Sequence, residues 1–179
     1  MPNCLTGASP NRSLRVCTRE GVLILKPEGR LLAAAGHASE TGKRADNQDF
    51  VGVYTATETE RARHGMIAAL ADGVGGAKGG RIAAELAVRS LIDGLYDQPD
   101  TIGPAAAVAR VMGPYNRWLH SAGKSDALAH AATTFTALVL KGRRAHALHV
   151  GDSRAWLFRD GRLTQLTEDH CHAHPDQRH

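Results

Sequence analysis

Asp72 is the first residue whose position suggests chemistry. It follows residues 64–71, an almost unbroken apolar run with the length of a buried strand. Glycines at positions 73, 75 and 76 let the chain turn sharply there and expose its carbonyl and amide groups. A carboxylate held between a stiff strand and such a turn is suited to bind a metal ion. Asp before Gly is also a common turn pair, so Asp72 alone leaves both interpretations open.

Asp49 supplies a second carboxylate. It begins residues 49–54, a segment rich in aromatic and β-branched residues that is typical of a strand. We predict that the charged residues 55–63 form a hairpin connection, which makes the two strands antiparallel neighbours. Asp49 opens its strand and Asp72 closes the next, and in an antiparallel pair these two ends share an edge. The two carboxylates are therefore predicted to converge.

Other catalytic patterns do not fit the chain. A G-x-G-x-x-G fingerprint would need a third glycine where Lys78 stands, and no G-x-x-x-x-G-K-[ST] loop occurs. Ser153 is not set in a G-x-S-x-G elbow, and strand alternation would send Ser153 and His149 to unrelated places. We therefore interpret His149 as a sheet histidine rather than a base. Thr133 and Thr134 are interpreted as structural residues.

The composition indicates one globular domain and argues against several kinds of partner. With 179 residues, of which 42% are hydrophobic, the chain can bury one core but is short for two domains. The net charge of +4 comes from dispersed Lys and Arg with few aromatic residues among them, so we expect no nucleic-acid partner. No apolar run approaches the roughly 20 residues of a membrane helix, so we expect no membrane partner. Three widely spaced cysteines without a C-x-x-C pair indicate a reducing compartment, so we predict a cytoplasmic protein.

The N-terminal third is expected to begin with a tail. Residues 1–30 contain scattered Pro and Gly and are predicted to be mobile, with one strand-like stretch at 22–26. Residues 31–36 are short and apolar and are predicted to be a strand. Three strands would then lie between positions 31 and 71.

Two helices and an antiparallel meander are predicted next. Apolar residues recur at helical spacing over residues 79–96 and 101–120, and Gly113-Pro114 is expected to kink or divide the second helix. Asp160-Gly161 is a strong hairpin signal. Sheet packed on sheet with helices outside gives an α+β sandwich. The expected strands of the second half are residues 133–140, 144–150, 154–159 and 162–166.

Motifs in a fixed order make the sequence resemble a known family. Together they resemble the bacterial form of the metal-dependent Ser/Thr protein phosphatases of the 2C class, the PPM family, over about residues 31–170. The resemblance implies an αββα sandwich of two antiparallel sheets flanked by helices. The motifs are Arg44-Ala45-Asp46-Asn47-Gln48-Asp49, Ala71-Asp72-Gly73-Val74-Gly75-Gly76, Thr133-Thr134 and His149-Val150-Gly151-Asp152-Ser153-Arg154, followed by Leu166-Thr167-Glu168-Asp169-His170.

The resemblance also implies a centre of two Mn²⁺ or Mg²⁺ ions at one edge of the sandwich. Asp49 and Asp72 would be metal ligands, with Asp72 bridging the ions and the carbonyl of Gly73 adding an oxygen. Oxygen ligands of this type suit hard divalent cations. Arg44 would clamp the substrate phosphate with its planar guanidinium group. Asp152 would either help to hold an additional metal ion or only tie its own turn.

The implied reaction is hydrolysis of phosphoserine or phosphothreonine in proteins. A water between two dications becomes hydroxide-like near neutral pH, and the same ions offset negative charge on the phosphoryl oxygens. No Ser or Cys nucleophile is then needed, so we expect direct in-line hydrolysis without a phosphoenzyme. Phosphorylated proteins are the expected substrates, with an opposing Ser/Thr kinase as a further partner.

The sequence departs from the family pattern at two places. Val74 stands where some relatives have a histidine thought to protonate the leaving group, which bacterial relatives often lack. After His170 the chain enters a His-rich tail, residues 171–179, instead of the elements that supply two further aspartates to the metal centre. We expect a shifted or truncated reading frame rather than a zinc-binding tail, because ligands one or two residues apart cannot easily wrap one tetrahedral ion.

Two alternatives to an active phosphatase remain open. One is a catalytically inactive fragment that binds phosphoproteins or pairs with another chain through an open sheet edge. The other is a non-enzymatic nucleotide-binding fold. Metal-dependent turnover of a phosphopeptide would distinguish the phosphatase from both.

Overall fold

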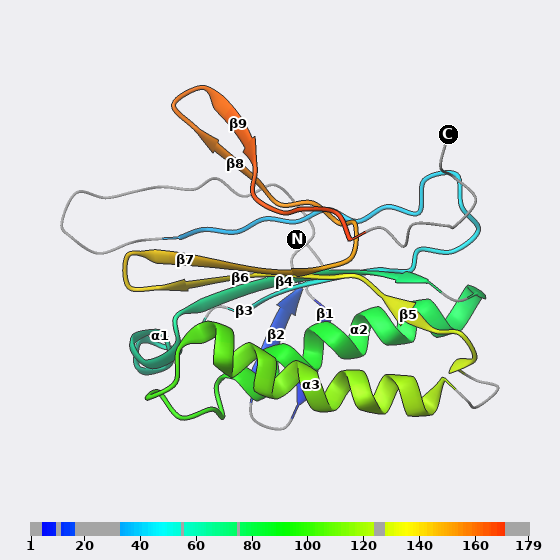
Figure 1. Ribbon diagram of the computed structural model, residues 1–179, viewed down its shortest axis with the longest axis horizontal. Coiled ribbons are helices and arrows are strands. Elements are labelled where there is room, and N and C mark those ends of the chain that lie inside the picture. The colour runs from blue at the N-terminus through cyan, green and yellow to red at the C-terminus, as the bar shows by residue number, and fades with distance from the viewer. Residues whose placement is uncertain are drawn as a thin grey trace.

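The central layer of the fold is an antiparallel sheet of seven strands (Figure 1). The computed structural model describes residues 5–9, 12–16, 33–54, 56–74, 76–123 and 128–170. Six strands follow one another in the order β1-β2-β3-β4-β6-β7, and the short β5 pairs with β4. These strands are β1 (Leu5–Ser9), β2 (Arg12–Val16), β3 (Asp49–Tyr54), β4 (Met66–Val74), β5 (Ala132–Thr133), β6 (Phe135–Lys141) and β7 (Arg144–Val150).

Two long helices cover one face of this sheet. α2 (Gly76–Leu95) lies against β3 and β4, and α3 (Pro104–Ala122) packs on α2 (Figure 1). Alanines at positions 83, 84 and 87 are fully buried and let α2 approach the sheet closely. The hydrophobic core therefore fills the space between the sheet and α2. Its largest fully buried side chains are Ile67, Val88, Leu91, Ile92, Leu95 and Val139.

A two-stranded hairpin lies on the opposite face of the sheet. Its strands, β8 (Trp156–Arg159) and β9 (Arg162–Gln165), pair antiparallel and form a separate small sheet. Asp160 and Gly161 both have positive φ angles, 52° and 74°, as a two-residue turn of this hand requires. The segment before β3, cyan in Figure 1, crosses the same side of the sheet as this hairpin.

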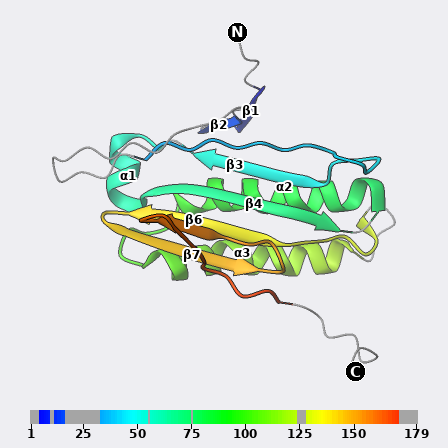
Figure 2. The ribbon, with the colours of Figure 1, turned by 90° about the horizontal axis from the view of Figure 1, so that it is seen from above.

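The layer order confirms the predicted class of fold. The described residues form two antiparallel sheets, and two long helices cover the outer face of the larger one. Seen from above, β4 lies between β3 and β6, with α2 and α3 beneath (Figure 2). In the part of the chain that the structure describes, no helix lies beyond the β8–β9 hairpin, and none is long and apolar enough to span a membrane.

The connection between β3 and β4 joins two antiparallel neighbours, as predicted. It contains a helix, α1 (Glu58–His64), which begins with a capping box. The backbone N–H of Glu60 donates to the Thr57 hydroxyl at 3.3 Å, and the backbone N–H of Thr57 donates to the Glu60 carboxylate at 2.9 Å. Thr-x-x-Glu is a recognised signal for a helix start, and the interpretation of residues 55–63 as a hairpin connection did not include this helix.

The expectation of a strand at residues 31–36 is wrong for residues 33–36. Residues 33–36 form no strand, and residues 31–32 lie outside the described residues. Part of the predicted N-terminal tail instead forms β1 and β2, which pair with each other and join the sheet through β3. The predicted stretch at 22–26 and the tail at 171–179 lie outside the described residues. The boundaries of the domain at residues 31 and 170 stay a prediction.

Two expectations in the second half need correction. Pro114 lies inside a continuous α3, so of the two expected effects, a kink or a division of the helix, the division is wrong. The meander is interrupted after β7, because the chain leaves the large sheet at Gly151 and crosses to the hairpin layer. Gly151 has a φ of 109°, a conformation that glycine adopts without the strain other residues meet.

Candidate metal centre

Asp49 and Asp72 stand directly opposite each other on β3 and β4. The N–H of Gly73 donates to the carbonyl of Gln48 at 3.2 Å, which makes Gln48 and Gly73 the hydrogen-bonded pair and Asp49 and Asp72 a non-hydrogen-bonded pair. Side chains approach more closely in such pairs. The predicted convergence of the two carboxylates is confirmed.

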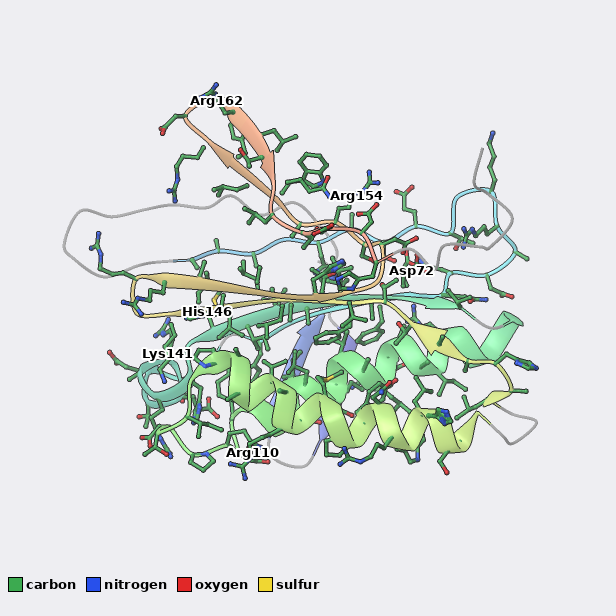
Figure 3. The ribbon with its side chains drawn as sticks, viewed as in Figure 1. Asp72, Arg110, Lys141, His146, Arg154 and Arg162 are labelled. Carbon is green, nitrogen blue, oxygen red and sulfur yellow. The ribbon has the colours of Figure 1, made fainter. Side chains whose placement is uncertain are left out.

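The carboxylates face away from the helices. Phe50 and Ala71, the neighbours of the two aspartates along β3 and β4, are buried on the helix side. Successive side chains alternate between the faces of a sheet, so Asp49 and Asp72 point to the hairpin side. Figure 3 shows Asp72 on that side, below Arg154. The site is thus carried by two central strands and opens on the face opposite the core.

The backbone of Asp72 is fixed by the chain around β5. Its N–H donates to the hydroxyl of Thr134 at 2.9 Å, and its carbonyl accepts from the N–H of Thr134 at 2.9 Å and the hydroxyl of Thr133 at 3.1 Å. The interpretation of both threonines as structural is confirmed. Their specific task, which the sequence did not indicate, is to hold the candidate metal ligand from the side away from Asp49.

A further bond joins Thr134 to the loop that carries Asp152. The hydroxyls of Thr134 and Ser153 are 2.7 Å apart. Gly151 packs closely against the same threonine. A Cβ at Gly151 would lie 2.7 Å from the Thr134 side chain. The loop of Asp152 is therefore anchored to the residue that anchors Asp72.

The charges around Asp72 favour a cation. Burial raises the pKa of the Asp72 carboxyl above its ordinary value, and the facing Asp49 raises this pKa further through its charge and a side-chain hydrogen bond. Asp152 adds a smaller effect in the same direction, and Arg44 opposes them. Two facing carboxylates therefore need a proton or a cation between them. An all-oxygen donor set suits a hard divalent ion such as Mn²⁺ or Mg²⁺, so these residues fit the implied metal.

A pocket of about 380 Å³ joins the carboxylates to cationic side chains. Asp49 and Asp72 line one side of it, and Lys43 and Arg44 belong to the loop that forms another side. Asp152 does not line this pocket, although its charge contributes to the raised pKa of Asp72. A cation at the carboxylates and a phosphate at the guanidinium group would be neighbours in such a pocket.

Gly73 lies near the end of β4 and packs against Gly80 of α2. A Cβ at Gly73 would lie 2.0 Å from the carbonyl oxygen of Gly80, so only glycine allows this close approach.

The candidate ligands do not form a complete metal site by themselves. They are Asp49, Asp72, Gly73 and Asp152. Within the described ranges, no group of three or more His, Cys, Asp or Glu side chains is arranged to hold one metal ion.

His149 is a sheet histidine, as expected, and it is fully engaged. Its two ring nitrogens are 2.8 Å from the Thr136 hydroxyl and 2.9 Å from the Gly151 carbonyl oxygen. Its ring centroid is 5.2 Å from that of His170. Arg154 is paired with Asp169 through its Nε, 2.9 Å from one carboxylate oxygen. These residues shape the loop between β7 and the hairpin.

Comparison with known proteins gives the same assignment as the motifs. The family model described as Protein phosphatase 2C matches residues 38–178. The protein phosphatase PhpP of Streptococcus pneumoniae is 38% identical over 130 residues, which are 72% of this chain and 51% of that protein. The serine/threonine protein phosphatase PstP of Mycobacterium tuberculosis is 34% identical over 126 residues, 70% of this chain and 23% of that protein.

Solved structures agree in fold. The M. tuberculosis serine/threonine phosphatase PstP/Ppp has a TM-score of 0.56 and 33% identity, covering 70% of this chain and 49% of that one. The S. agalactiae serine/threonine phosphatase has a TM-score of 0.62 and 31% identity, covering 72% and 52%. The chain spans about half the length of PhpP, with 51% covered. Since the family model matches residues 38–178, most of its length, the chain belongs to the protein phosphatase 2C family.

Proposed function

We propose that this chain takes part in metal-dependent hydrolysis of phosphoserine and phosphothreonine in proteins. The observation that carries the proposal is the facing pair Asp49 and Asp72, in a pocket that also holds Arg44. Burial, and then the charge of Asp49, raise the pKa of Asp72. Carboxylates for a cation and a guanidinium group for a phosphate are the two recognition elements such a reaction needs. Membership of the protein phosphatase 2C family supports the same reaction.

Each candidate residue has a role in this proposal. Asp49 and Asp72 would hold two Mn²⁺ or Mg²⁺ ions, with the carbonyl of Gly73 as a further oxygen ligand and Asp152 at an additional, loosely held ion. When bound, these ions activate a water and offset negative charge on the phosphoryl oxygens. Arg44 would orient the phosphate with its planar, always-charged fork. Thr134 would keep Asp72 in place through the two backbone hydrogen bonds described above.

Phosphorylated proteins are the proposed substrates. Relatives named as protein phosphatases in S. pneumoniae and M. tuberculosis support this choice. A Ser/Thr kinase would then supply the substrate. The widely spaced cysteines support a reducing, cytoplasmic location.

Substitution of Asp72 tests the proposal. We expect Asp72→Ala to lower Mn²⁺-dependent hydrolysis of p-nitrophenyl phosphate by more than about 100-fold, because even residues that only support a metal ligand contribute roughly 10–100-fold. Asp46→Ala is the matched control, since Asp46 lines the same pocket but is not paired with Asp49. Hydrolysis that survives Asp72→Ala, or that falls equally with Asp46→Ala, would contradict the assignment.

Arg44→Ala separates turnover from mere binding. A phosphopeptide substrate should be turned over by the wild type with Mn²⁺ and bound less tightly by Arg44→Ala, because the guanidinium group is lost. Binding of the phosphopeptide by the wild type without any metal-dependent turnover would favour the alternative of an inactive phosphoprotein-binding module.

A further inference from the structure

Arg81 approaches the candidate metal centre from the helix side of the sheet. It lies near the start of α2, and its Nη1 donates a hydrogen bond to the backbone carbonyl of Asp49. We propose that Arg81 is a positioning residue that fixes the backbone of Asp49 so that its carboxylate faces Asp72. This inference rests on the function proposed above.

The carbonyl of Asp49 points to the side of β3 that is away from β4. Asp49 and Asp72 form a non-hydrogen-bonded pair, in which the backbone groups of each residue point away from the other. The backbone N–H and carbonyl of Asp72 form hydrogen bonds with Thr134. On the free side of β3, the register between β2 and β3 in the described part of the chain pairs Arg15 with Val53, four residues beyond Asp49. Among the residues that the structure describes, Arg81 therefore supplies this carbonyl with a donor that the neighbouring strand does not.

The N–H of Asp49 is also held by a side chain. It donates to the Asn47 side-chain oxygen at 2.9 Å, and the Asn47 amide donates in turn to the Ser39 hydroxyl at 2.7 Å. Both backbone groups of Asp49 are thus fixed by side chains at a strand end, where strands otherwise fray. Of these two supports, Arg81 is the one that comes from a packed helix.

The Arg81 side chain is itself held in place. Its guanidinium carbon lies 5.2 Å from the centre of the Phe50 ring, within the range of a cation–π contact. Phe50 is 8% exposed and belongs to the core. Gly80, the preceding residue, packs against Gly73 so tightly that a Cβ there would lie 2.8 Å from the Gly73 carbonyl carbon. The start of α2 is therefore locked to the ends of both strands that carry the aspartates.

A positioning role and a simple charge effect of Arg81 predict opposite changes in metal affinity when Arg81 is substituted. A cation near the carboxylates would weaken metal binding by repulsion, so removal of the Arg81 charge alone would tighten it. Loss of the hydrogen bond acts in the opposite sense, because Asp49 would sample orientations that do not face Asp72. Supporting residues of metal ligands contribute roughly 10–100-fold to metal affinity.

The matched control is Arg89. Its guanidinium carbon also lies over the Phe50 ring, at 5.4 Å, and comes from the same helix. Arg89 instead pairs with Glu85, with 2.8 Å between its Nε and the carboxylate. Arg89→Gln therefore removes a cation–π contact with Phe50 and a charge of the same sign, and leaves the Asp49 carbonyl bonded.

The experiment measures Mn²⁺ dissociation constants by electron paramagnetic resonance, with thermal melting to confirm folding. We expect Arg81→Gln to weaken binding roughly 10-fold or more. Arg81→Lys, which keeps the charge and one donor, should restore part of the loss, and Arg89→Gln should stay within about twofold of the wild type, as additivity at unlinked sites implies. Unchanged or tighter binding by Arg81→Gln, or an equal loss in Arg89→Gln, would overturn the inference.

Amide hydrogen exchange gives a readout that needs no metal. The segment around residues 47–50 should exchange faster in Arg81→Gln than in the wild type and Arg89→Gln, because the strand end loses its support. Equal exchange in all three proteins would overturn the positioning role. Failure of the wild type to bind Mn²⁺ would instead overturn the proposed function, and with it this inference.

Discussion

At the scale of single residues, Asp72 carries a charge that the folded chain disfavours. Burial and the facing Asp49 both raise the pKa of its carboxyl. Because the pKa is raised in the folded state, ionisation of Asp72 destabilises the protein. Its free energy of unfolding falls as pH rises from the unfolded pKa of 3.8 through the folded pKa. The same repulsion is what makes the pair attractive to a divalent cation, so stability and metal binding are opposed at this site.

Asp72→Asn tests this opposition. In the presence of a chelator at pH 7, we expect Asp72→Asn to raise the free energy of unfolding above that of the wild type by at most about 1 kcal/mol. The substitution removes the repulsion, but solvent already screens part of it. The gain should vanish below pH 3.8, where the wild-type carboxyl is protonated in both states. Urea unfolding at several pH values measures it. A less stable Asp72→Asn protein at pH 7 would contradict the electrostatic account.

The sequence was sufficient to predict the Asp49–Asp72 pair, but not its supports. Both aspartates mark strand ends, and antiparallel pairing brings such ends together. Thr134 and Arg81 are separated from the residues they hold by many positions and by other elements. Their roles depend on side-chain directions that exist only after packing, and no local pattern encodes those directions.

At the scale of elements, α3 is joined to α2 by a buried hydroxyl. The Tyr115 hydroxyl donates to the Ala83 carbonyl at 2.6 Å. Burial raises the pKa of Tyr115 to about 12, from an ordinary value of 10.0. The neutral phenol is therefore favoured in the folded state, and its stabilising effect is complete below pH 10.0 and is lost as pH rises towards 12.

Tyr115→Phe should reveal this dependence. At pH 8 we expect the variant to be less stable by about 1 kcal/mol, because the Ala83 carbonyl loses its donor. The difference should shrink as pH rises from 10 to 12, since only the wild type has this phenol to ionise. Chemical unfolding at pH 8, 10 and 11.5 gives the comparison. A difference that stays constant across these pH values would show that Tyr115 does not titrate as the burial argument requires.

Elements were predictable where one pattern dominated locally. The apolar spacing of α2 and the Asp160-Gly161 turn gave correct elements because periodicity and turn chemistry act over a few residues. α1 was missed because its signal is the pair Thr57 and Glu60 rather than an apolar stripe. The passage of the chain from β7 to the hairpin layer depends on tertiary packing at Gly151 and Thr134, which local composition does not carry.

At the scale of the whole molecule, the two faces of the large sheet differ. The helix side contains the core. The hairpin side has a cavity of about 670 Å³ lined largely by apolar residues, including Leu70 and Leu138, which are 39% and 37% exposed. Phe158 and Leu163, paired across the hairpin, are 71% and 62% exposed. Apolar surface gathered on one side promotes self-association.

Changes at the hairpin should therefore alter association without altering the fold. We expect Phe158→Ser combined with Leu163→Thr to reduce concentration-dependent association, measured by sedimentation velocity, and to reduce binding of an apolar dye. The free energy of unfolding should change by less than about 0.5 kcal/mol per substitution, because both side chains are already exposed. Ile82→Thr is the control, since Ile82 is 41% exposed but lies on α2, on the helix side of the sheet. If Ile82→Thr reduced association as much as the hairpin variant, the difference between the two faces would not determine how the molecule associates.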